Sequence, residues 1–351
     1  MVVDRHLKRA FDLAHDSIRT HPNPRVGAVV VSADGEVVGE GWHEGPGTKH
    51  AEVMALANAG DAANGATVYV SLEPCNHHGR MKPCTDALIE AGVSRVVVGT
   101  EDPDSRVSGQ GIEHLRQCGR GMEVEVIDHP SARKVDPAYF HHRESGMPLV
   151  TVKWAMTLDG SVAAVDGTSQ WITTDLARTQ VHDLRSQVDA VVVGAGTLRA
   201  DDPRLDVRTM GYRDTQPRPV VVAGTGRLPD TAQLWEREPI VVSATEMEVP
   251  AGELLVVGGS DGLPDPVNTC SSLADLGLLH LLLEGGPTLA GAWWRAGVVD
   301  NGIVHIGAKV GGGTGRSPMD GVFSTIADAD DVEFDTVRNV SDDIVIAFKK
   351  R

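Results

Sequence analysis

The chain has 351 residues, which is long for a single core and suits two domains. Its 49 acidic side chains outnumber its 32 basic ones, which gives a net charge of −17 at pH 7. A chain this acidic repels a polyphosphate backbone, so we expect no nucleic-acid partner. No apolar run approaches the roughly 18 residues of a membrane span, so we expect no membrane partner. The four cysteines suit thiols or metal ligands, and with no export signal at the N-terminus we expect a cytoplasmic protein.

Helical and β-branched segments alternate through the first part of the chain. The pattern predicts helices over about 4–20, 50–59, 84–91 and 109–118. It predicts strands over 26–31, 37–42, 67–71, 95–99 and 123–127. This alternation is typical of a three-layer α/β domain with a mixed sheet.

Composition changes near residue 146, where we place the domain boundary. Eleven of the 14 histidines lie before it. The polar stretch 141–146 is followed by Pro148 and then by a new apolar run. The expected domains are therefore residues 1–146 and 147–351.

The second part also has an α/β pattern. Apolar runs lie at 149–155, 189–194, 219–223, 239–243, 254–257, 279–283 and 303–306. Helical patterns cover about 174–187 and 287–296, and two further strands are expected near 332–340 and 343–349. Segments 208–218 and 258–268 are expected to be loops. Trp293 and Trp294 lie on a predicted helix and belong either to the core or to an interface.

A metal-ligand pattern stands out in the first domain. His50, Cys75 and Cys84 offer one imidazole and two thiols, the donor set of a zinc site that keeps one position open for water. Glu52 lies two residues from His50, too divergent on a helix to share the metal, but able to reach a water beside it. These are the parts of a hydrolytic zinc deaminase, with Glu52 moving the protons.

Two other interpretations of the cysteines remain open. They could be core thiols, or they could form a structural metal site with His77 or His78 as additional ligands. The eight residues between Cys75 and Cys84 also differ from the Pro-Cys-x-x-Cys spacing usual in nucleoside deaminases.

Several motifs together resemble one family, the bifunctional riboflavin-biosynthesis deaminase–reductases. In the first domain these are residues 23–27 (NPRVG), 50–52 (HAE) and 72–80 (LEPCNHHGR). In the second they are 153–160 (KWAMTLDG), 171–173, 189–197, 201–208 (DDPRLDVR) and 284–289 (EGGPTL). The resemblance covers essentially the whole chain in the family's order.

The resemblance implies a cytidine-deaminase-like domain followed by a dihydrofolate-reductase-like α/β domain. It implies hydrolytic deamination of 2,5-diamino-6-ribosylamino-4(3H)-pyrimidinone 5′-phosphate and then NADPH-dependent reduction of the ribosyl group to a ribityl chain. Zn²⁺ would be bound by His50, Cys75 and Cys84, with Glu52 catalytic. The pyrimidine and ribose phosphate would be bound by Asn23, His43, His77, Arg80 and Asp102.

For the second domain the resemblance implies two further groups of residues. Those that would bind NADPH are Ala155, Trp171, Thr197, Asp201, Gly286, Pro287, Thr288 and Leu289. Those that would bind the substrate of the reduction are Lys153, Ser169, Arg185, Leu205, Arg208 and Glu284. Lys153 and Glu284 are the candidates for the proton donor. Residues 285–288 lie between a strand and a helix, where backbone amides receive phosphate. The glycines at 311–315 suit either a phosphate loop or a turn.

The chain departs from the family pattern at a few positions. Met81 and Lys82 precede the second cysteine, and Lys82 would add a cation near the phosphate pocket. Asp104 and Ser105 replace an Asn-Pro pair, which puts Asp104 in doubt as a substrate ligand. The other departures are Ala223-Gly224, Asn301 and Ala308.

Two competing hypotheses remain. One is a zinc deaminase of another base, nucleoside or tRNA with a C-terminal domain that only binds a ligand. The other is a zinc-stabilised scaffold without enzyme activity. Under the leading hypothesis the partners are small phosphorylated pyrimidines, and we expect a homo-oligomer, either a dimer or a tetramer.

Overall fold

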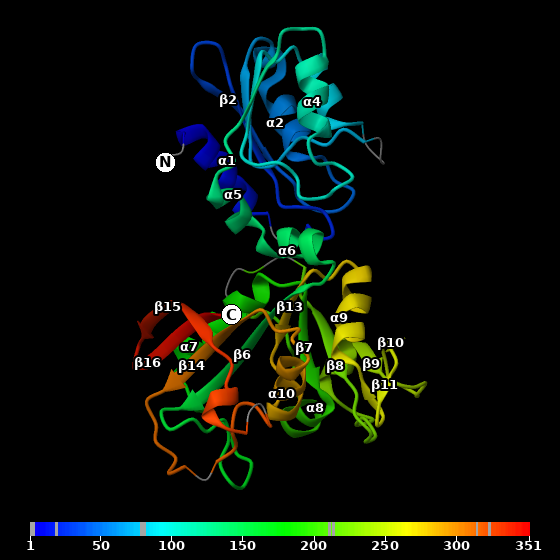
Figure 1. Cartoon of the computed structure of the whole chain (residues 1–351), viewed down its shortest axis with the longest axis vertical. Coiled ribbons are helices and arrows are strands. Elements are labelled where there is room, and N and C mark those ends of the chain that lie inside the picture. The colour runs from blue at the N-terminus through cyan, green and yellow to red at the C-terminus, as the bar shows by residue number, and fades with distance from the viewer. Residues whose placement is uncertain are drawn as a thin grey trace. The chain divides into compact units, whose positions relative to one another are not determined.

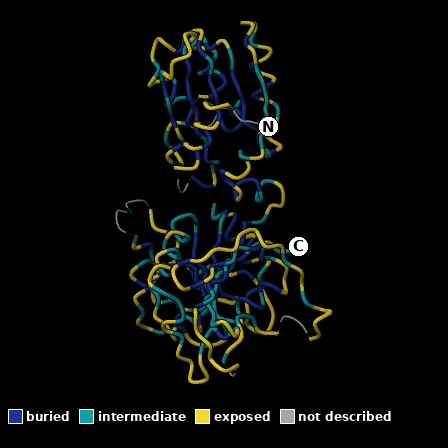
Figure 2. Tube along the Cα trace, turned by 90° about the vertical axis from the view of Figure 1, so that its left-hand side faces the viewer, coloured by how far each residue is buried: buried dark blue, intermediate teal, exposed yellow. Residues whose placement is uncertain are grey.

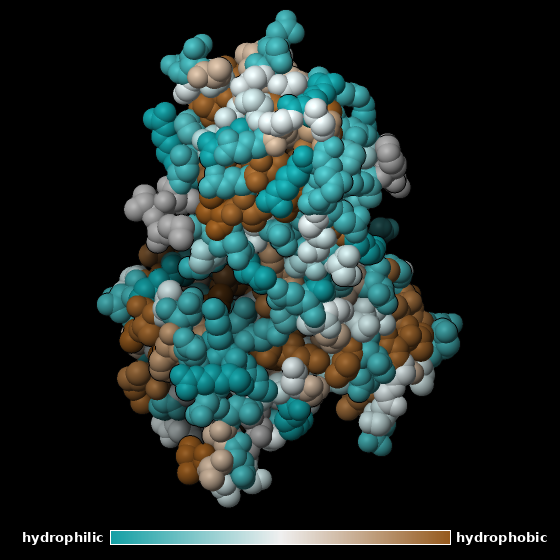
Figure 3. Space-filling view, turned by 45° about the horizontal axis from the view of Figure 1, so that its top comes forward, coloured by the Kyte–Doolittle hydropathy of each residue, from teal (hydrophilic) through white to brown (hydrophobic). Residues whose placement is uncertain are grey.

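The computed structural model describes residues 4–17, 20–77, 82–209, 212, 215–313, 315–321 and 324–351. The chain forms two compact units, Met1–Gly146 and Met147–Arg351 (Figure 1). In each unit the buried residues gather inside an exposed coat (Figure 2). Hydrophilic residues cover most of the face drawn in Figure 3, interrupted by apolar patches. None of the described helices is both long and apolar enough to span a bilayer.

The N-terminal unit is built on a five-stranded sheet. Its strands are β1 (Gly27–Val31), β2 (Val37–Trp42), β3 (Thr67–Val70), β4 (Arg95–Val98) and β5 (Glu123–Val126). They lie in the order β2-β1-β3-β4-β5. The pairs β1–β2 and β1–β3 are antiparallel, whereas β3–β4 and β4–β5 are parallel. The sheet is therefore mixed, as the sequence predicts.

Helices cover both faces of this sheet and give three layers. α1 (Arg5–His15) and α5 (Pro130–Val135) pack on one face, where Leu7 and Phe11 meet Val29. α2 (Ala51–Ala59), α3 (Cys84–Glu90) and α4 (Gln110–Gln117) pack on the other, where Leu88 and Leu115 are buried. A short 3₁₀ helix (Gly60–Ala63) follows α2, and α6 (Pro137–Ser145) ends the unit.

The C-terminal unit is built on a nine-stranded sheet in the order β10-β9-β8-β7-β13-β6-β14-β16-β15. Seven strands run parallel and pair in turn: β10 (Glu253–Val256), β9 (Ile240–Ser243), β8 (Arg218–Val222), β7 (Ala190–Gly194), β13 (His280–Leu283), β6 (Leu149–Thr157) and β14 (Asn301–Gly307). β16 (Asp343–Lys350) and β15 (Val332–Val340) complete the sheet as antiparallel neighbours. β11 (Gly259–Ser260) and β12 (Leu263–Pro264) form a separate small ribbon.

The large sheet is also covered on both faces. α9 (Pro266–Asp275) and α10 (Pro287–Arg295) bury Leu273, Trp293 and Trp294 against one face, which places both tryptophans in the core. α7 (Asp175–Ser186) and α8 (Ala195–Asp201) cover the other face, with Leu198 fully packed. Short 3₁₀ helices lie at Gln233–Arg237 and Ile326–Asp328.

The predicted strands and the longer helices are confirmed to within a few residues, but the first helix ends at His15 instead of near residue 20. Helices α5, α6, α8 and α9 are not among the predictions. The loop predicted over 258–268 is wrong in part, because it contains β11, β12 and the start of α9. The loop predicted over 208–218 falls partly outside the described residues.

Candidate active sites

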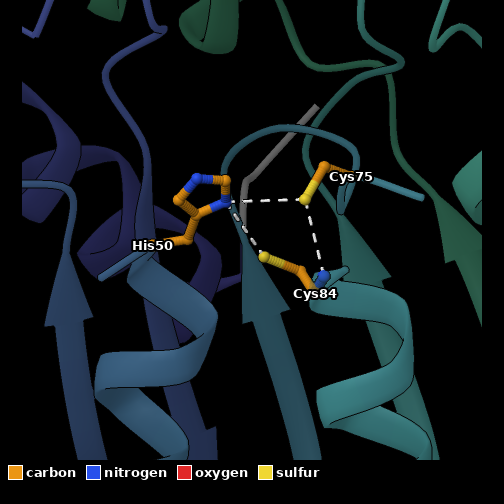
Figure 4. Close-up of side chains that lie close together, drawn as sticks. All are labelled: His50, Cys75 and Cys84. Atoms are coloured by element: carbon orange, nitrogen blue, oxygen red, sulfur yellow. Dashed lines mark hydrogen bonds between the residues drawn. The ribbon is translucent and has the colours of Figure 1, made fainter. Parts of the chain in front are cut away.

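The three predicted metal ligands meet at one point of the N-terminal unit. His50 is the N-cap of α2, Cys84 is the first residue of α3, and Cys75 lies in the loop after β3 (Figure 4). The His50 Nδ1 atom lies 3.2 Å from the Cys84 sulfur and 3.5 Å from the Cys75 sulfur. All three ligand atoms lie within 4.8 Å of one another. Zn²⁺ binds sulfur at about 2.3 Å and nitrogen at about 2.0 Å, so one ion fits among them.

Local packing brings these ligands together. A side chain at Gly41 on β2 would place its Cβ 2.4 Å from the Ala51 carbonyl oxygen, so a glycine is needed for the start of α2 to approach the sheet. The Glu73 carboxylate accepts hydrogen bonds from the amides of Asp102, Gly109, Gly111 and Ile112. The loop that carries Cys75 is therefore fixed against the start of α4.

The electrostatics of the cysteines suit a metal ligand. The Cys84 thiol and the His50 imidazole hydrogen-bond to the Cys75 sulfur and lower its pKa to about 4. The hydrogen bond that Cys84 donates to Cys75 in turn raises the pKa of Cys84, and burial adds to this increase. These hydrogen bonds thus favour the thiolate form of Cys75.

The Glu52 side chain is buried beside the metal ligands. It lies in the first turn of α2 and is only 3% exposed. Burial, followed by the negative charge of Cys75, raises its pKa to about 7. A carboxyl group with this pKa can both accept and donate a proton at neutral pH.

A cavity of about 370 Å³ opens above these groups. Its lining includes the predicted residues Asn23, His43, His50, Glu52, Cys75, His77 and Asp102. The Asn23 amide donates to His43 Nε2 over 3.2 Å, while His43 Nδ1 donates to the Lys49 carbonyl oxygen over 3.2 Å. This hydrogen bond uses the side-chain nitrogen of Asn23, so the side-chain oxygen is left to accept a hydrogen bond from a ligand. Arg80 and His78 lie outside the described residues.

Sequence reasoning did not find several residues that line the same cavity. They are Arg106, Tyr139 and Arg143; Asp104, which the sequence puts in doubt as a substrate ligand, lines the cavity as well. The Tyr139 hydroxyl donates to the Asp102 carboxylate over 3.0 Å. Tyr139 and Arg143 belong to α6, whose polar sequence hides its helical pattern. Lys82 pairs with Glu90 and is not among the lining residues.

In the C-terminal unit, two of the predicted substrate residues form a largely buried ion pair. Arg185 from α7 contacts Glu284, which follows β13, through two hydrogen bonds of 2.7 and 2.9 Å. Burial alone would raise the pKa of Glu284, but the Arg185 guanidinium lowers it below its usual value. Burial lowers the pKa of Lys153 on β6, and the charges of Glu284 and Arg185 also act on its ammonium group. The three side chains therefore form one electrostatic group.

The predicted cofactor residues other than Trp171 lie on or just after neighbouring parallel strands. β7 leads into α8, which carries Thr197 and Asp201, and β13 leads into α10 at Gly286 and Pro287. A Cβ at Gly286 would lie 3.6 Å from the Thr197 hydroxyl. Ala155 lies on β6, next to β13 in the sheet. Helix starts at the carboxyl edge of a parallel sheet are suited to binding phosphate.

Leu205 and Arg208 follow α8. Leu205 is buried with a positive φ of 53°. Arg208 pairs with Asp206 over 3.3 Å, with 60% of its side chain exposed. The backbone carbonyl oxygen of Asp206 also accepts a hydrogen bond from Arg185. The 205–208 segment therefore contacts the Arg185–Glu284 ion pair.

A second cavity, of about 490 Å³, groups Ser169 and Trp171 with Lys309 and the glycine loop. The Arg178 guanidinium lies 4.2 Å above the Trp171 ring. The amides of Gly311, Gly312 and Gly313 all donate to the Asp159 carboxylate, at 2.7 to 3.1 Å. These amides are satisfied within the chain, which favours the turn over the phosphate loop.

Known protein families match both units of the chain. A family model described as the RibD C-terminal domain matches residues 148–346, and one described as the cytidine and deoxycytidylate deaminase zinc-binding region matches residues 2–100. Riboflavin biosynthesis protein RibD from Aquifex aeolicus is 39% identical over 98% of both chains. The chain belongs to the RibD family. RibD from Escherichia coli is 36% identical over 97% of both chains.

Solved structures of the family share the whole fold. RibD from Acinetobacter baumannii has a TM-score of 0.90 and 33% identity, with 98% of both chains covered. The Thermotoga maritima diaminohydroxyphosphoribosylaminopyrimidine deaminase/5-amino-6-(5-phosphoribosylamino)uracil reductase has a TM-score of 0.88 and 32% identity, over 99% of this chain and 98% of that one.

As a RibD family member, the protein is a bifunctional deaminase and reductase of riboflavin biosynthesis, and it uses zinc and NADPH. Family membership over nearly the whole chain decides against a lone deaminase with a passive C-terminal domain. It also decides against a scaffold without activity.

Proposed function

We propose that residues 1–146 deaminate 2,5-diamino-6-ribosylamino-4(3H)-pyrimidinone 5′-phosphate and that residues 147–351 then reduce its ribosyl group with NADPH. The Thermotoga maritima relative, which carries this pair of activities in its name, matches the chain over nearly its full length. The observation that carries the first half is the buried Glu52 carboxyl beside His50, Cys75 and Cys84, in a cavity that also exposes Asn23.

In the deamination, water replaces the amino group and ammonia leaves. Zn²⁺ bound by His50, Cys75 and Cys84 would supply the Lewis acidity that makes water a nucleophile near neutral pH. Glu52 would accept one proton from water and pass it to the ring nitrogen, and would then carry a second proton from the newly added hydroxyl to the departing amine. Asn23, oriented by His43, would bind the edge of the pyrimidine.

His77 and Asp102 would bind the ribose, because both line the cavity. Arg80 is also proposed as a phosphate ligand on the strength of the resemblance.

In the reduction, NADPH would supply the hydride to the sugar carbon. Ala155, Trp171, Thr197, Asp201 and residues 286–289 would bind the cofactor. The pair of Arg185 and Glu284 would bind the substrate, together with Ser169, Leu205 and Arg208. Arg185 keeps Glu284 ionised, so Glu284 has no proton to give. We therefore assign the proton donation to Lys153.

The first experiment measures ammonia release from the diaminopyrimidinone ribosyl phosphate by zinc-loaded protein without NADPH. Glu52→Gln is the matched control, because it keeps the shape of the side chain and removes the proton transfer. Release should fall by at least about 10²-fold in this variant while its zinc content stays unchanged. NADPH oxidation should then depend on the deaminated product. Absence of release from folded, zinc-loaded wild-type protein would contradict the substrate assignment.

We also propose a cytoplasmic location and a homo-oligomer, a dimer or tetramer. Reducing conditions would preserve the zinc-site thiols. Phe334 and Val337 are 65% and 62% exposed on the edge strand β15, which supports an interface there. Sedimentation equilibrium of the full chain tests the oligomeric state.

A further inference from the structure

Asp104 is tied to two arginines of the deaminase cavity. Its carboxylate accepts hydrogen bonds from Arg106, at 2.9 Å from Nε and 2.5 Å from Nη2. The Nε atom of Arg143 lies 3.4 Å from the same carboxylate, at a geometry that makes an ion pair without a hydrogen bond. Asp104 is only 7% exposed. Its oxygens are thus directed to cations of the protein and not to a neutral substrate hydroxyl.

Arg143 is the more firmly held of the two arginines. Its guanidinium lies 4.8 Å above the ring of Tyr139, one turn earlier on α6. Its Nη2 atom donates to the Pro22 carbonyl oxygen over 3.2 Å, and its Nη1 atom lies 3.3 Å from His142 Nδ1. The Arg143 side chain is 19% exposed, whereas that of Arg106 is 76% exposed. Arg143 therefore presents a preorganised guanidinium at the cavity wall.

The charges of the cavity lining point to an anion at this wall. Among the described lining residues, Arg106 and Arg143 carry the only side chains with a permanent positive charge. The two guanidinium groups share one carboxylate, Asp104, whereas the neighbouring carboxylate of Asp102 accepts its hydrogen bond from the Tyr139 hydroxyl. Glu73 lines the cavity as well, but backbone amides of the α4 start surround its carboxylate. A planar guanidinium is well matched to the oxygens of a phosphate group.

We propose that Arg143 binds the 5′-phosphate of the deaminase substrate, and that Asp104 and Tyr139 are positioning residues that hold its guanidinium. Arg106 adds a second, more exposed cation. This proposal rests on the proposed function, because it takes the ribosyl phosphate as substrate. It assigns a role to the departure at Asp104: the carboxylate orders the arginines that recognise the phosphate.

The test compares ammonia release from the phosphorylated substrate and from its dephosphorylated riboside. Arg143→Met keeps a long apolar side chain and removes the guanidinium. The ratio of the two kcat/KM values should fall about 10- to 100-fold in this variant, mainly through KM of the phosphorylated substrate. Arg143→Lys should fall between wild type and Arg143→Met. Arg106→Gln is the matched control and should change the ratio less, because Arg106 is exposed.

Folding is checked by the zinc content of each variant and by NADPH oxidation with the deaminated intermediate. An unchanged ratio, including equal losses on both substrates, would assign Arg143 a purely structural role and overturn the proposal. A larger effect of Arg106→Gln would overturn the choice of Arg143. If wild-type protein released ammonia from neither compound, the proposed function would fail on its own. Calorimetry with ribose 5-phosphate would then decide, since the Arg143→Met chain must bind one equivalent fewer than wild type.

Discussion

Arg185 and Glu284 lie 99 residues apart in the sequence and meet edge to edge in the C-terminal unit. The Nε atom of Arg185 lies 2.7 Å from Oε1 of Glu284, and Nη2 lies 2.9 Å from Oε2. Each side chain is 12% exposed. Two parallel hydrogen bonds of this kind fix both groups in orientation as well as in distance.

Glu284→Gln should destabilise the C-terminal unit, because it leaves the buried Arg185 charge without a counter-ion. The free energy of unfolding should fall by about 3 kcal/mol. Urea denaturation followed by tryptophan fluorescence measures this, since five of the six tryptophans lie after residue 146. Reduction should be lost, whereas ammonia release should stay at the wild-type rate. A change in unfolding free energy below about 0.5 kcal/mol would show that the pair contributes little.

The Arg185–Glu284 pair also shows what sequence patterns do not reveal. Apolar runs predict each strand, because the parallel strands are buried on both faces. They do not predict that β13 lies between β7 and β6, and this order brings Glu284 under α7. The zinc site was predictable because one imidazole and two thiols form a known zinc donor set, and because His50 and Cys84 lie at helix starts.

Helix α6 was missed for a different reason. Its sequence carries histidines, an arginine and a glutamate, so no apolar stripe appears. The usable signal was Pro137 in the first turn after Asp136, whose carboxylate accepts a hydrogen bond from the Tyr139 amide. The same signal, Asp265 before Pro266, marks α9. Without a prediction of α6, the sequence gives no reason to place Tyr139 and Arg143 in the cavity.

His305→Phe should make the protein more resistant to acid. His305 on β14 is 1% exposed, and neither ring nitrogen has a hydrogen-bond partner among the described residues. Burial, and then the nearby Lys153 charge, lower its pKa to about 4. The unfolded chain has a histidine pKa of about 6.5, so between these values it binds a proton that the folded state does not. Stability is therefore lost as the pH falls from about 6.5 toward 4.

The phenylalanine variant lacks this loss. Its unfolding free energy should exceed that of wild type by about 1 kcal/mol at pH 7, because two unpartnered buried nitrogens disappear. The difference should grow by about 3 kcal/mol, to about 4 kcal/mol, near pH 4. Urea denaturation of both proteins at pH 7, 6 and 5 measures the trend. A difference that stays constant with pH would mean that His305 titrates normally in the folded state.

Gly111→Ala, a change in α4, should displace the loop that carries the zinc ligand Cys75. A Cβ at this position in α4 would lie 2.0 Å from the Pro74 carbonyl oxygen, so the residue before Cys75 must move. Zinc affinity and ammonia release should both fall. Gly196→Ala is the matched control, since its Cβ meets no atom within 4 Å and lies in α8. Zinc per chain, measured by colorimetric release, checks the prediction, and full zinc content with full activity would contradict it.

Metal-free protein should react with iodoacetamide at Cys75 before any other cysteine. Its pKa of about 4 makes it a thiolate at pH 6, and its side chain is partly exposed. Cys270 is buried, which raises its pKa to about 12 and keeps it unreactive. Zinc reloading before the reagent should protect Cys75. Peptide mass spectrometry identifies the labelled residue, and faster labelling at Cys118 would refute the prediction. Protein alkylated at Cys75 should lose ammonia release and keep NADPH oxidation with the deaminated intermediate, because the thiolate is needed only by the zinc site.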